Sequence, residues 1–279
     1  MNIQKQLHIK IENPETKTIL ADAFYPESQH KLPLVVFAHG YKGYKDWGAW
    51  SLMAEEFAKA GFFFVKFNFS HNGTTLEKPN EFGDLEAFGQ NNFSKEMSDF
   101  KAVLDYFSMH DNVDPDHISI IGHSRGGGVA VLTAFEDERV KKLITFAGVS
   151  NFKYRFPNGE RLEKWKEEGV MYSENLRTHQ QMPHYFQYYE DFLANEDRFN
   201  IQYAAQHLEK PFLIVQGTDD DAVKDKEAHL LHEWCKTSEI LLVEGANHVF
   251  GAKEPWQENQ LPEHLYFITQ KAIDFINKH

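Results

Sequence analysis

The sequence predicts an α/β fold with a mostly parallel central sheet of about eight strands and helices on both faces. Three observations support this prediction. Short apolar runs alternate with amphipathic stretches of helical length along most of the chain. The run LPLVVFA at 32–38 is continuous, as expected for a strand that is covered on both faces. A chain of 279 residues is also long enough for one large domain with a sizeable core.

The order of the expected elements explains the parallel sheet. The first two strands, 3–11 and 18–25, alternate loosely and indicate an antiparallel hairpin at a sheet edge. After this hairpin, strands and helices alternate, which is typical of a sheet whose parallel strands are linked by helices. The expected strands are 32–38, 61–67, 118–121, 142–147, 211–216 and 239–243, and the expected helices are 49–60, 93–109, 125–135, 224–236 and 262–277.

Residues 150–200 break this alternation and mix many aromatic residues with charged ones. The segment is too long for an ordinary connection, so we expect it to carry helices of its own. It could be a packed excursion with a small separate core, or a helical cap that covers an active site. We expect both features together. Residues 1–279 are then a single domain, with a cap insertion at 150–200.

The composition restricts the partners of the protein. The formal net charge is −13, which argues against nucleic acid and anionic membrane surfaces as partners, because basic patches bind both. A single cysteine, Cys235, excludes an intrachain disulfide. The first residues lack the apolar run of a signal peptide, and no apolar run reaches the length of a membrane span. We therefore expect a cytoplasmic protein.

The segment Gly122-His123-Ser124-Arg125-Gly126 matches the pattern G-x-S-x-G between an expected strand and an expected helix. A serine on so tight a turn needs neighbours without side chains, because the backbone folds back on itself. The turn would place the Ser124 hydroxyl at a helix N-terminus, where free N–H groups stabilise negative charge. A glycine-rich packing turn is the alternative interpretation.

Other chemically active residues follow the ends of other expected strands. In open parallel sheets, ligand sites form outside the carboxyl ends of the strands. Here those ends carry His39-Gly40-Tyr41, Ser124, the aspartates 219–221 and His248. The order along the chain is serine, aspartate, histidine, and the three adjacent aspartates compete for the middle position.

The segments H-G-Y-K-G-Y-K-D-W (39–47) and G-H-S-R-G-G (122–127) together resemble the α/β-hydrolase superfamily. The resemblance extends over nearly the whole chain except 150–200. It is strongest with small bacterial esterases such as the cinnamoyl and feruloyl esterases. Hydrolases like dienelactone hydrolase and prolyl oligopeptidase are their relatives. The resemblance implies an α/β-hydrolase fold.

The resemblance also implies roles for individual residues. Ser124 corresponds to the nucleophile, and His248, in the loop G-A-N-H-V-F, to the base that accepts its proton. The family pattern G-x-x-D-x-x-V falls on Gly217, Asp220 and Val223, so Asp220 corresponds to the acid that orients the histidine. The two neighbouring aspartates are then expected to cap the loop or to be solvated.

An oxyanion hole needs two N–H donors aimed at the developing negative charge. The fold implies the backbone N–H of Arg125, directly after the nucleophile, and that of Tyr41, after the third strand. His39 and Gly40 would shape the loop that carries Tyr41. We expect the side chain of Arg125 to form a structural salt bridge, with binding of an acidic substrate as the alternative.

Two further motifs do not predict a site. His229-Leu230-Leu231-His232-Glu233 matches neither H-E-x-x-H nor H-x-x-E-H, so we expect no metal and expect both histidines to be exposed. The glycines 126–128 lack the Lys-Ser/Thr of a phosphate-binding loop. We therefore expect no cofactor.

These observations predict a serine hydrolase that cleaves carboxylic esters through an acyl-enzyme. The aromatic residues of 150–200 favour a small-molecule ester with an apolar or aromatic part, of which a hydroxycinnamoyl ester is one case. A peptidase or amidase with the same three residues is an alternative. A non-catalytic binding protein is a second alternative, but it requires a missing member of the set, and the sequence contains all three.

Overall fold

A computed structural model describes residues 2–279 of the chain. Eight strands form the central sheet: β1 (Ile3–Ile11), β2 (Ile19–Pro26), β3 (Leu32–Ala38), β4 (Phe63–Asn68), β5 (Val113–His123), β6 (Val140–Phe146), β9 (Phe212–Gly217) and β10 (Ser238–Val243). The strand order is β1-β2-β4-β3-β5-β6-β9-β10. β2 runs antiparallel to both of its neighbours, and every other pair in this sheet is parallel. The predicted mostly parallel sheet and its edge hairpin are confirmed.

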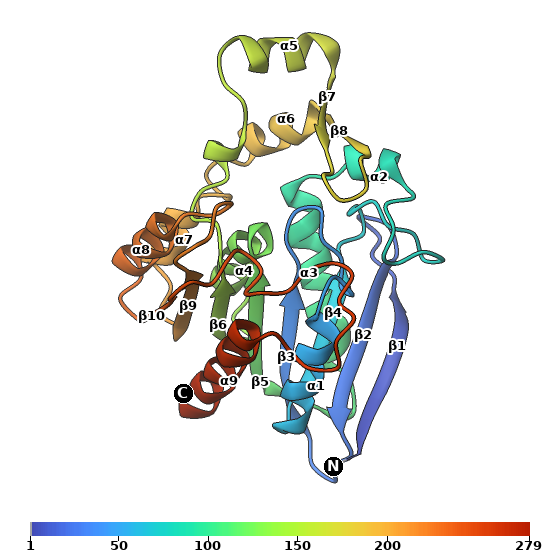
Figure 1. Ribbon diagram of the computed structural model, residues 1–279. Helices are drawn as coiled ribbons and strands as arrows, with labels where there is room; N and C mark the ends of the chain where they lie inside the picture. The colour runs from blue at the N-terminus through green and yellow to red at the C-terminus, as the bar shows by residue number, and fades with distance from the viewer. Residues whose placement is uncertain (1) are drawn as a thin grey trace.

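Helices cover both faces of the sheet (Figure 1). α1 (Trp50–Lys59) and α9 (Glu263–Lys278) pack on one face with Phe37, Phe64 and Val215 of the strands. The other face carries α3 (Phe93–Ser108), α4 (Arg125–Glu136), α7 (Ile201–Gln206) and α8 (Asp225–Trp234). Of the helices that the structure describes, none has both the length and the apolar character needed to cross a bilayer.

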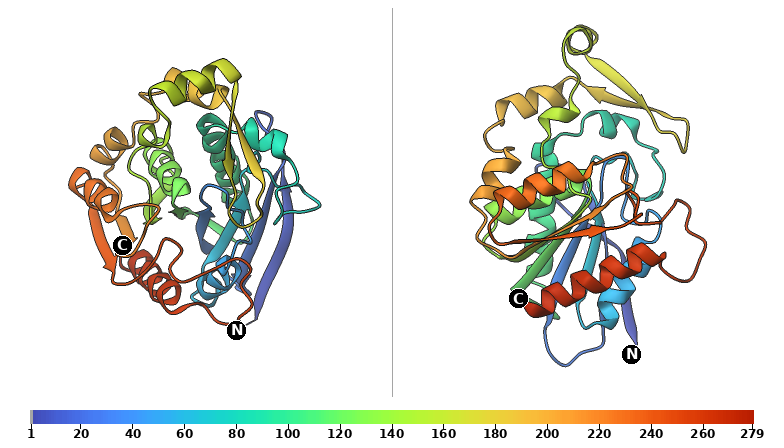
Figure 2. Two further views of the ribbon diagram at one scale, coloured as in Figure 1. Left: turned by 45° about the horizontal axis from the view of Figure 1, so that its top comes forward. Right: turned by 60° about the vertical axis from the view of Figure 1, so that its left-hand side comes forward.

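The segment 150–200 projects beyond the carboxyl ends of the strands (Figure 2). It contains the short 3-10 helix η1 (Lys153–Arg155), the helices α5 (Glu160–Glu168) and α6 (Gln187–Ala194), and two strands, β7 (Val170–Glu174) and β8 (Gln181–Tyr185). The two strands form a separate antiparallel pair, which we call the cap hairpin. The expectation of helices alone was therefore incomplete. Each strand has only five residues, and none of those in β7 is buried, so no regular alternation marks the hairpin in the sequence.

Two short helices also lay outside the predicted elements. α2 (Leu85–Gly89) falls in a polar stretch between β4 and α3, where the side chain of Asp84 accepts a hydrogen bond from the backbone N–H of Ala87. α7 follows the cap and begins after Asn200, whose side chain accepts from the N–H of Tyr203. Helices of five or six residues contain too few turns to produce a recognisable apolar period, and their caps decide where they form.

Candidate active site

Ser124 occupies a sharp turn between β5 and α4, with φ of 56° and ψ of −121°. The turn requires its flanking glycines. A Cβ atom on Gly122 would lie 2.2 Å from the carbonyl oxygen of Gly126, and one on Gly126 would lie 2.4 Å from that of His39. Any larger residue would force the strand and the helix apart, which explains the spacing in G-x-S-x-G.

Hydrogen bonds hold the backbone of Ser124 from both sides. Its N–H donates to the carbonyl of Phe146 in β6 at 2.9 Å, and its carbonyl accepts from the N–H groups of Gly127 and Val149 at 2.9 and 3.1 Å. The loop after β3 lies directly against the serine, since a Cβ on Gly40 would be 2.8 Å from the Cβ of Ser124. The neighbouring strands thus fix the orientation of the serine.

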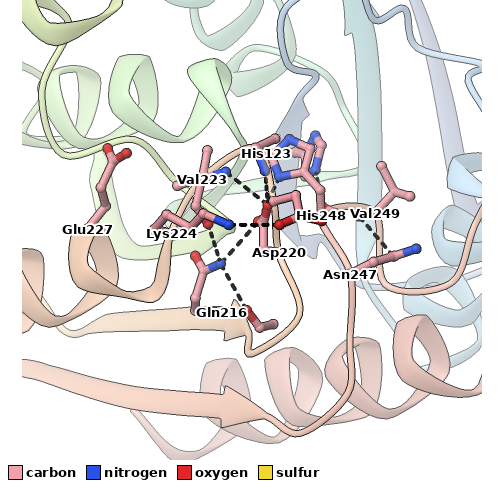
Figure 3. A network of polar contacts seen from close by, with 12 residues as sticks. His123, Gln216, Asp220, Val223, Lys224, Glu227, Asn247, His248 and Val249 are labelled. Carbon is pink, nitrogen blue, oxygen red and sulfur yellow. Dashed lines mark hydrogen bonds and ion pairs between the residues drawn. The ribbon is translucent and has the colours of Figure 1, made fainter.

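His248 and Asp220 form a pair after the last two strands (Figure 3). Nδ1 of His248 lies 2.8 Å from Oδ2 of Asp220. Because an ionised carboxylate only accepts, Nδ1 carries the proton and leaves Nε2 free to act as a base. Oδ1 of Asp220 accepts from the backbone N–H groups of Ala222 and Val223, at 2.8 and 2.9 Å. Burial alone would raise the pKa of Asp220, but the bonds from His248 and the backbone outweigh it and lower the pKa.

The structure places only Asp220, of the three adjacent aspartates, against His248. Asp220 is buried, whereas Asp219 and Asp221 are exposed, and Asp221 pairs with Lys224 at the surface. Sequence reasoning missed the residue that supports Asp220: Gln216, buried in β9, donates from Nε2 to Oδ2 of Asp220 at 3.0 Å. In the sequence, the available signal for this role was a single polar residue, Gln216, within the otherwise apolar run PFLIVQG.

His123, beside the serine, is a second supporting residue without a predicted role. Its Nε2 lies 2.9 Å from the backbone carbonyl of His248, so Nε2 carries the proton and donates. Its ring packs against those of Trp50 and His248. Burial lowers the pKa of His123 to about 3, so the imidazole stays neutral and the bond persists at neutral pH. His123 therefore links the serine turn to the histidine loop.

The predicted oxyanion donors lie on two adjoining segments. Within residues 2–279, the backbone N–H groups of Tyr41 and Arg125 have no hydrogen-bond acceptor, as a site for a ligand oxygen requires. His39 fixes the loop that carries Tyr41: its Nδ1 donates to the carbonyl of Gly40 at 2.9 Å, and its Nε2 accepts from the N–H of Phe69 at 3.3 Å. Burial lowers the pKa of His39 to about 4, which keeps this arrangement.

A buried group of charges anchors the far end of the same loop. Nζ of Lys45 lies 2.6 Å from Oδ2 of Asp22, and Nζ of Lys66 lies 2.8 Å from the same oxygen. Asp46 pairs with both lysines. Although burial favours the neutral acid, the two lysines hold the pKa of Asp22 at about 2. Since β2, β4 and the loop each contribute, these ion pairs tie residues 45 and 46 to the sheet.

The side chain of Arg125 forms the predicted salt bridge, with Glu96 of α3. Its guanidinium lies over the ring of Tyr41, 5.0 Å from the ring centre, and Nη1 donates to Oη of Tyr188 at 3.3 Å. Burial would lower the pKa of Arg125, but the Glu96 carboxylate outweighs it and raises the pKa, so the guanidinium stays charged. Glu96 already neutralises this charge, which disfavours the alternative role of binding an acidic substrate.

Ser124 and His248 line one cavity of about 480 Å³ beneath the cap. Most of its wall is apolar or aromatic, and the aromatic rings belong to α3, the cap and the Tyr41 loop: Tyr41, Phe93, Phe152, Phe156, Trp165 and Tyr188. Arg125, Ser173 and His184 add polar groups to the wall. The cap and the core thus both form the binding space in front of the serine.

The two histidines of the rejected metal motif, His229 and His232, are both exposed on α8, as expected. In the described part of the chain, no three or more His, Cys, Asp or Glu side chains gather in a geometry that could hold a metal ion.

Comparison with known proteins gives the family. The sequence profile of the prolyl oligopeptidase family matches residues 52–273, which is most of the chain. The chain belongs to the prolyl oligopeptidase family. This assignment confirms the predicted resemblance to prolyl-oligopeptidase-like hydrolases. It also supports hydrolase activity for this chain.

Two curated proteins share about a quarter of their aligned residues with this member of the prolyl oligopeptidase family. The quorum-quenching protein AidA of Acinetobacter baumannii is 26% identical over 142 residues, or 51% of this chain and 43% of AidA. The uncharacterised peptidase YtmA of Bacillus subtilis is 25% identical over 170 residues, or 60% of each chain. The chain thus matches less than two thirds of the length of either relative.

Solved structures share the fold over nearly the whole of this family member. Est1E from Butyrivibrio proteoclasticus, with bound ferulic acid, has a TM-score of 0.72 and 18% identity, and the match covers 97% of this chain and 98% of Est1E. The esterase domain of a Rhodothermus marinus protein has a TM-score of 0.67 and 16% identity, with coverage of 100% and 99%. The predicted α/β-hydrolase fold is confirmed.

Proposed function

We propose that this protein is a serine hydrolase of carboxylic esters, with Ser124 as nucleophile, His248 as base and Asp220 as the orienting acid. One observation carries the proposal. The serine, on its strained turn, and the paired histidine line the same cavity, although they come from distant parts of the chain. Such a constellation supports nucleophilic catalysis, in which a serine and a histidine oriented by a carboxylate face the same substrate-binding space.

In the first half of the reaction, Ser124 Oγ attacks the ester carbonyl carbon and gives its proton to Nε2 of His248. The carbonyl electron pair moves onto oxygen, where the N–H groups of Tyr41 and Arg125 stabilise the negative charge. When the pair returns, the bond to the alcohol oxygen breaks, and His248 delivers its proton to that oxygen. The alcohol leaves, and the acyl group remains on Ser124.

Water completes the cycle by the same steps in reverse. It attacks the acyl carbon while His248 accepts one of its protons, and Ser124 Oγ departs with that proton from His248. Asp220 stabilises the imidazolium in both halves, and its lowered pKa keeps it ionised for this task. Gln216 and the backbone donors to Asp220 hold the carboxylate in place.

The cavity favours an ester with an apolar or aromatic part. Its aromatic wall can pack against a ring or chain by burial of apolar surface, and a volume of about 480 Å³ suits a small molecule. The likeness in fold to Est1E, whose structure holds ferulic acid, supports aromatic acyl esters as the first class to test. A hydroxycinnamoyl ester is therefore included in the panel below.

The test is hydrolysis by wild type and Ser124→Ala of p-nitrophenyl acetate, p-nitrophenyl butyrate, methyl ferulate and an aminoacyl p-nitroanilide. We expect ester turnover by wild type and a loss of at least about 10³-fold in kcat for Ser124→Ala, since the nucleophile is removed. Circular dichroism should show an intact fold, because the hydroxyl contributes little to packing. Wild-type rates in Ser124→Ala would contradict the mechanism.

Membership in the prolyl oligopeptidase family favours a second candidate, a peptidase or amidase that uses the same residues. The same panel separates the two. Cleavage of the anilide without ester turnover would favour the peptidase, whereas ester turnover with an inert anilide would favour the esterase. If no substrate is cleaved, labelling of wild type but not Ser124→Ala by a fluorophosphonate would still identify Ser124 as an activated nucleophile.

A further inference from the structure

The cap hairpin and the loop that carries Tyr41 are joined by side-chain hydrogen bonds. Oη of Tyr41 lies 2.7 Å from Oγ of Ser173 in β7 and 2.7 Å from Nε2 of His184 in β8. Ser173 and His184 also contact one another, with 3.2 Å between Oγ and Nε2. Nζ of Lys42 donates to the backbone carbonyl of Glu174 at 2.7 Å. Two consecutive residues of the loop therefore bind the hairpin.

The hairpin is itself held firmly, so these bonds can position the loop. The indole N–H of Trp165, a buried residue of α5, donates to the backbone carbonyl of His184 at 2.7 Å. At the hairpin turn, Nε2 of Gln180 donates to the carbonyl of Phe82 at 2.8 Å. β8 also packs against α2, where Tyr185 binds Glu86. Both ends of the hairpin are thus attached to other elements.

The cap also contacts the other predicted oxyanion donor. Arg125 lies against the ring of Tyr41, and its guanidinium donates to Tyr188 of α6. The two residues whose N–H groups would bind the oxyanion therefore touch one another, and each binds the cap through its side chain. A shift of the cap would move the Tyr41 loop relative to Ser124.

We propose that the cap hairpin sets the geometry of the oxyanion hole, with Ser173 and His184 as positioning residues that act through Tyr41. This inference rests on the proposed function. The hairpin would then do more than enclose the substrate: it would hold the Tyr41 N–H at the distance that the transition state requires. Because a displacement of about 1 Å can cost about 10²-fold in rate, such support affects kcat more than KM.

The test measures kcat and KM for p-nitrophenyl acetate, whose small acyl group needs little contact with the cap. We expect Tyr41→Phe and His184→Phe each to lower kcat about tenfold, with KM within about twofold of wild type. Ser173→Ala should lower kcat by a smaller factor. Ser173→Thr keeps the hydroxyl and should retain the kcat of wild type. Tyr172→Phe removes a hydroxyl from the exposed neighbour on β7 and is the matched control, with unchanged constants.

Two double variants sharpen the test. If Tyr41 and His184 act as one unit, the kcat of Tyr41→Phe/His184→Phe should be no lower than that of the more impaired single variant. Lys42 gives the loop a second bond to the hairpin, so Tyr41→Phe/Lys42→Met should lose more than Tyr41→Phe alone. Thermal unfolding of each variant verifies that the assays are made on folded protein.

The outcomes separate this inference from the proposed function. Ester turnover that depends on Ser124, with wild-type kcat in both His184→Phe and Tyr41→Phe/Lys42→Met, would overturn the positioning role alone. Losses confined to methyl ferulate, with acetate unaffected, would also overturn it, because they would assign these side chains to substrate contact. Turnover that survives in Ser124→Ala would instead overturn the proposed function.

Discussion

Ser124 adopts a backbone conformation that residues other than glycine rarely occupy. Such a conformation costs on the order of 1–3 kcal/mol and persists only where the surroundings impose it. Here the hydrogen bonds to β6 and the close approach of Gly122 and Gly126 impose it. At this turn Ser124 lines the cavity, and its side chain makes no capping hydrogen bond to the helix, which leaves the hydroxyl free for the proposed role of nucleophile.

Three buried histidines surround the site without sharing the role proposed for His248. Burial lowers the pKa of His39 to about 4, and the pKa values of His123 and His184 to about 3. Each imidazole therefore remains neutral at pH 7 and makes hydrogen bonds that fix one segment of the site. These buried neutral histidines lower the free energy of unfolding on acidification, because the unfolded chain can then take up protons that the native protein excludes.

This difference predicts an acid-dependent loss of stability. In the unfolded chain a histidine titrates near its ordinary pKa of 6.5, whereas native His123 does not until about 3. As pH falls below about 6.5, the unfolded state binds more protons, so the free energy of unfolding falls with pH. His123→Gln lacks this uptake while keeping an N–H donor for the carbonyl of His248. Its free energy of unfolding should therefore fall by about 2 kcal/mol less between pH 7 and pH 5 than that of wild type.

Urea unfolding of wild type and His123→Gln at both pH values gives the measurement. The comparison is a difference of differences, so any offset in stability that the substitution causes at pH 7 cancels. Equal losses in the two proteins would show that His123 is not the neutral, buried group described above.

At the scale of elements, the cap supplies most of the aromatic wall of the cavity. Phe156 lies between the cap helices and the cavity, with its ring 5.1 Å from that of Tyr188 and 5.0 Å from that of Phe192. Tyr154, two residues earlier, is 80% exposed. Tyr154, within η1, and Phe156, directly after it, therefore have opposite surroundings, and of the two only Phe156 lines the cavity.

We predict that Phe156→Ala selectively lowers kcat/KM for esters with large acyl groups. Loss of the ring removes apolar contact worth about 1.5–3 kcal/mol, so kcat/KM for methyl ferulate should fall roughly 10- to 100-fold. The acetyl ester fills less of the cavity and should lose less than about threefold. Tyr154→Ala is the matched control and should change neither value. Parallel losses for both esters would argue against an acyl-binding role of the cap.

At the scale of the whole molecule, the sheet assembles the site from four separate parts of the chain. Tyr41 follows β3, Ser124 follows β5, Asp220 follows β9 and His248 follows β10. These strands run parallel, so their carboxyl ends lie along one edge of the sheet (Figure 1). The proposed catalytic groups therefore converge although about 200 residues separate the first from the last.

The cap and the core share one hydrophobic cluster. Phe152 of the cap segment stacks on Phe93 of α3, with ring centres 3.8 Å apart, and Phe192 and Phe199 belong to the same buried group. A cap that packs into the main core cannot lose its structure without exposing that core. We therefore predict that residues 1–279 unfold as one cooperative unit, in accord with the single domain expected from the sequence.

Calorimetry and circular dichroism test this prediction. Wild type should show one calorimetric transition, and the near- and far-UV signals should change at the same temperature. Phe152→Ala should lower that temperature without splitting the transition, since it removes a buried ring worth about 3–5 kcal/mol. A separate early transition, lost when the cap is deleted, would identify the cap as an independent unit.

Much of this fold follows from patterns that are local in the sequence. Apolar runs such as LPLVVFA locate strands because a strand buried on both faces needs side chains without charge along its length. The cap hairpin escaped prediction because its two five-residue strands carry little apolar pattern and are held by contacts with α2 and Tyr41. His123 escaped because its partner, His248, is remote in sequence. Gln216 escaped because its bond to Asp220, four residues away, depends on how the loop after β9 turns back toward the strand.

The amino-acid sequence was therefore sufficient to predict the alternation of strands and helices, the glycine-flanked serine turn and the order of serine, aspartate and histidine. Each of these depends on residues that are close together in the chain or on the fixed topology of a parallel sheet. The family pattern had selected Asp220, and the folded structure shows this aspartate against His248. The rings that line the cavity and the side chains that bind Tyr41 became known from the folded structure alone. These depend on packing and burial between distant segments, and no local pattern records which side chain a folded neighbour will shield from water.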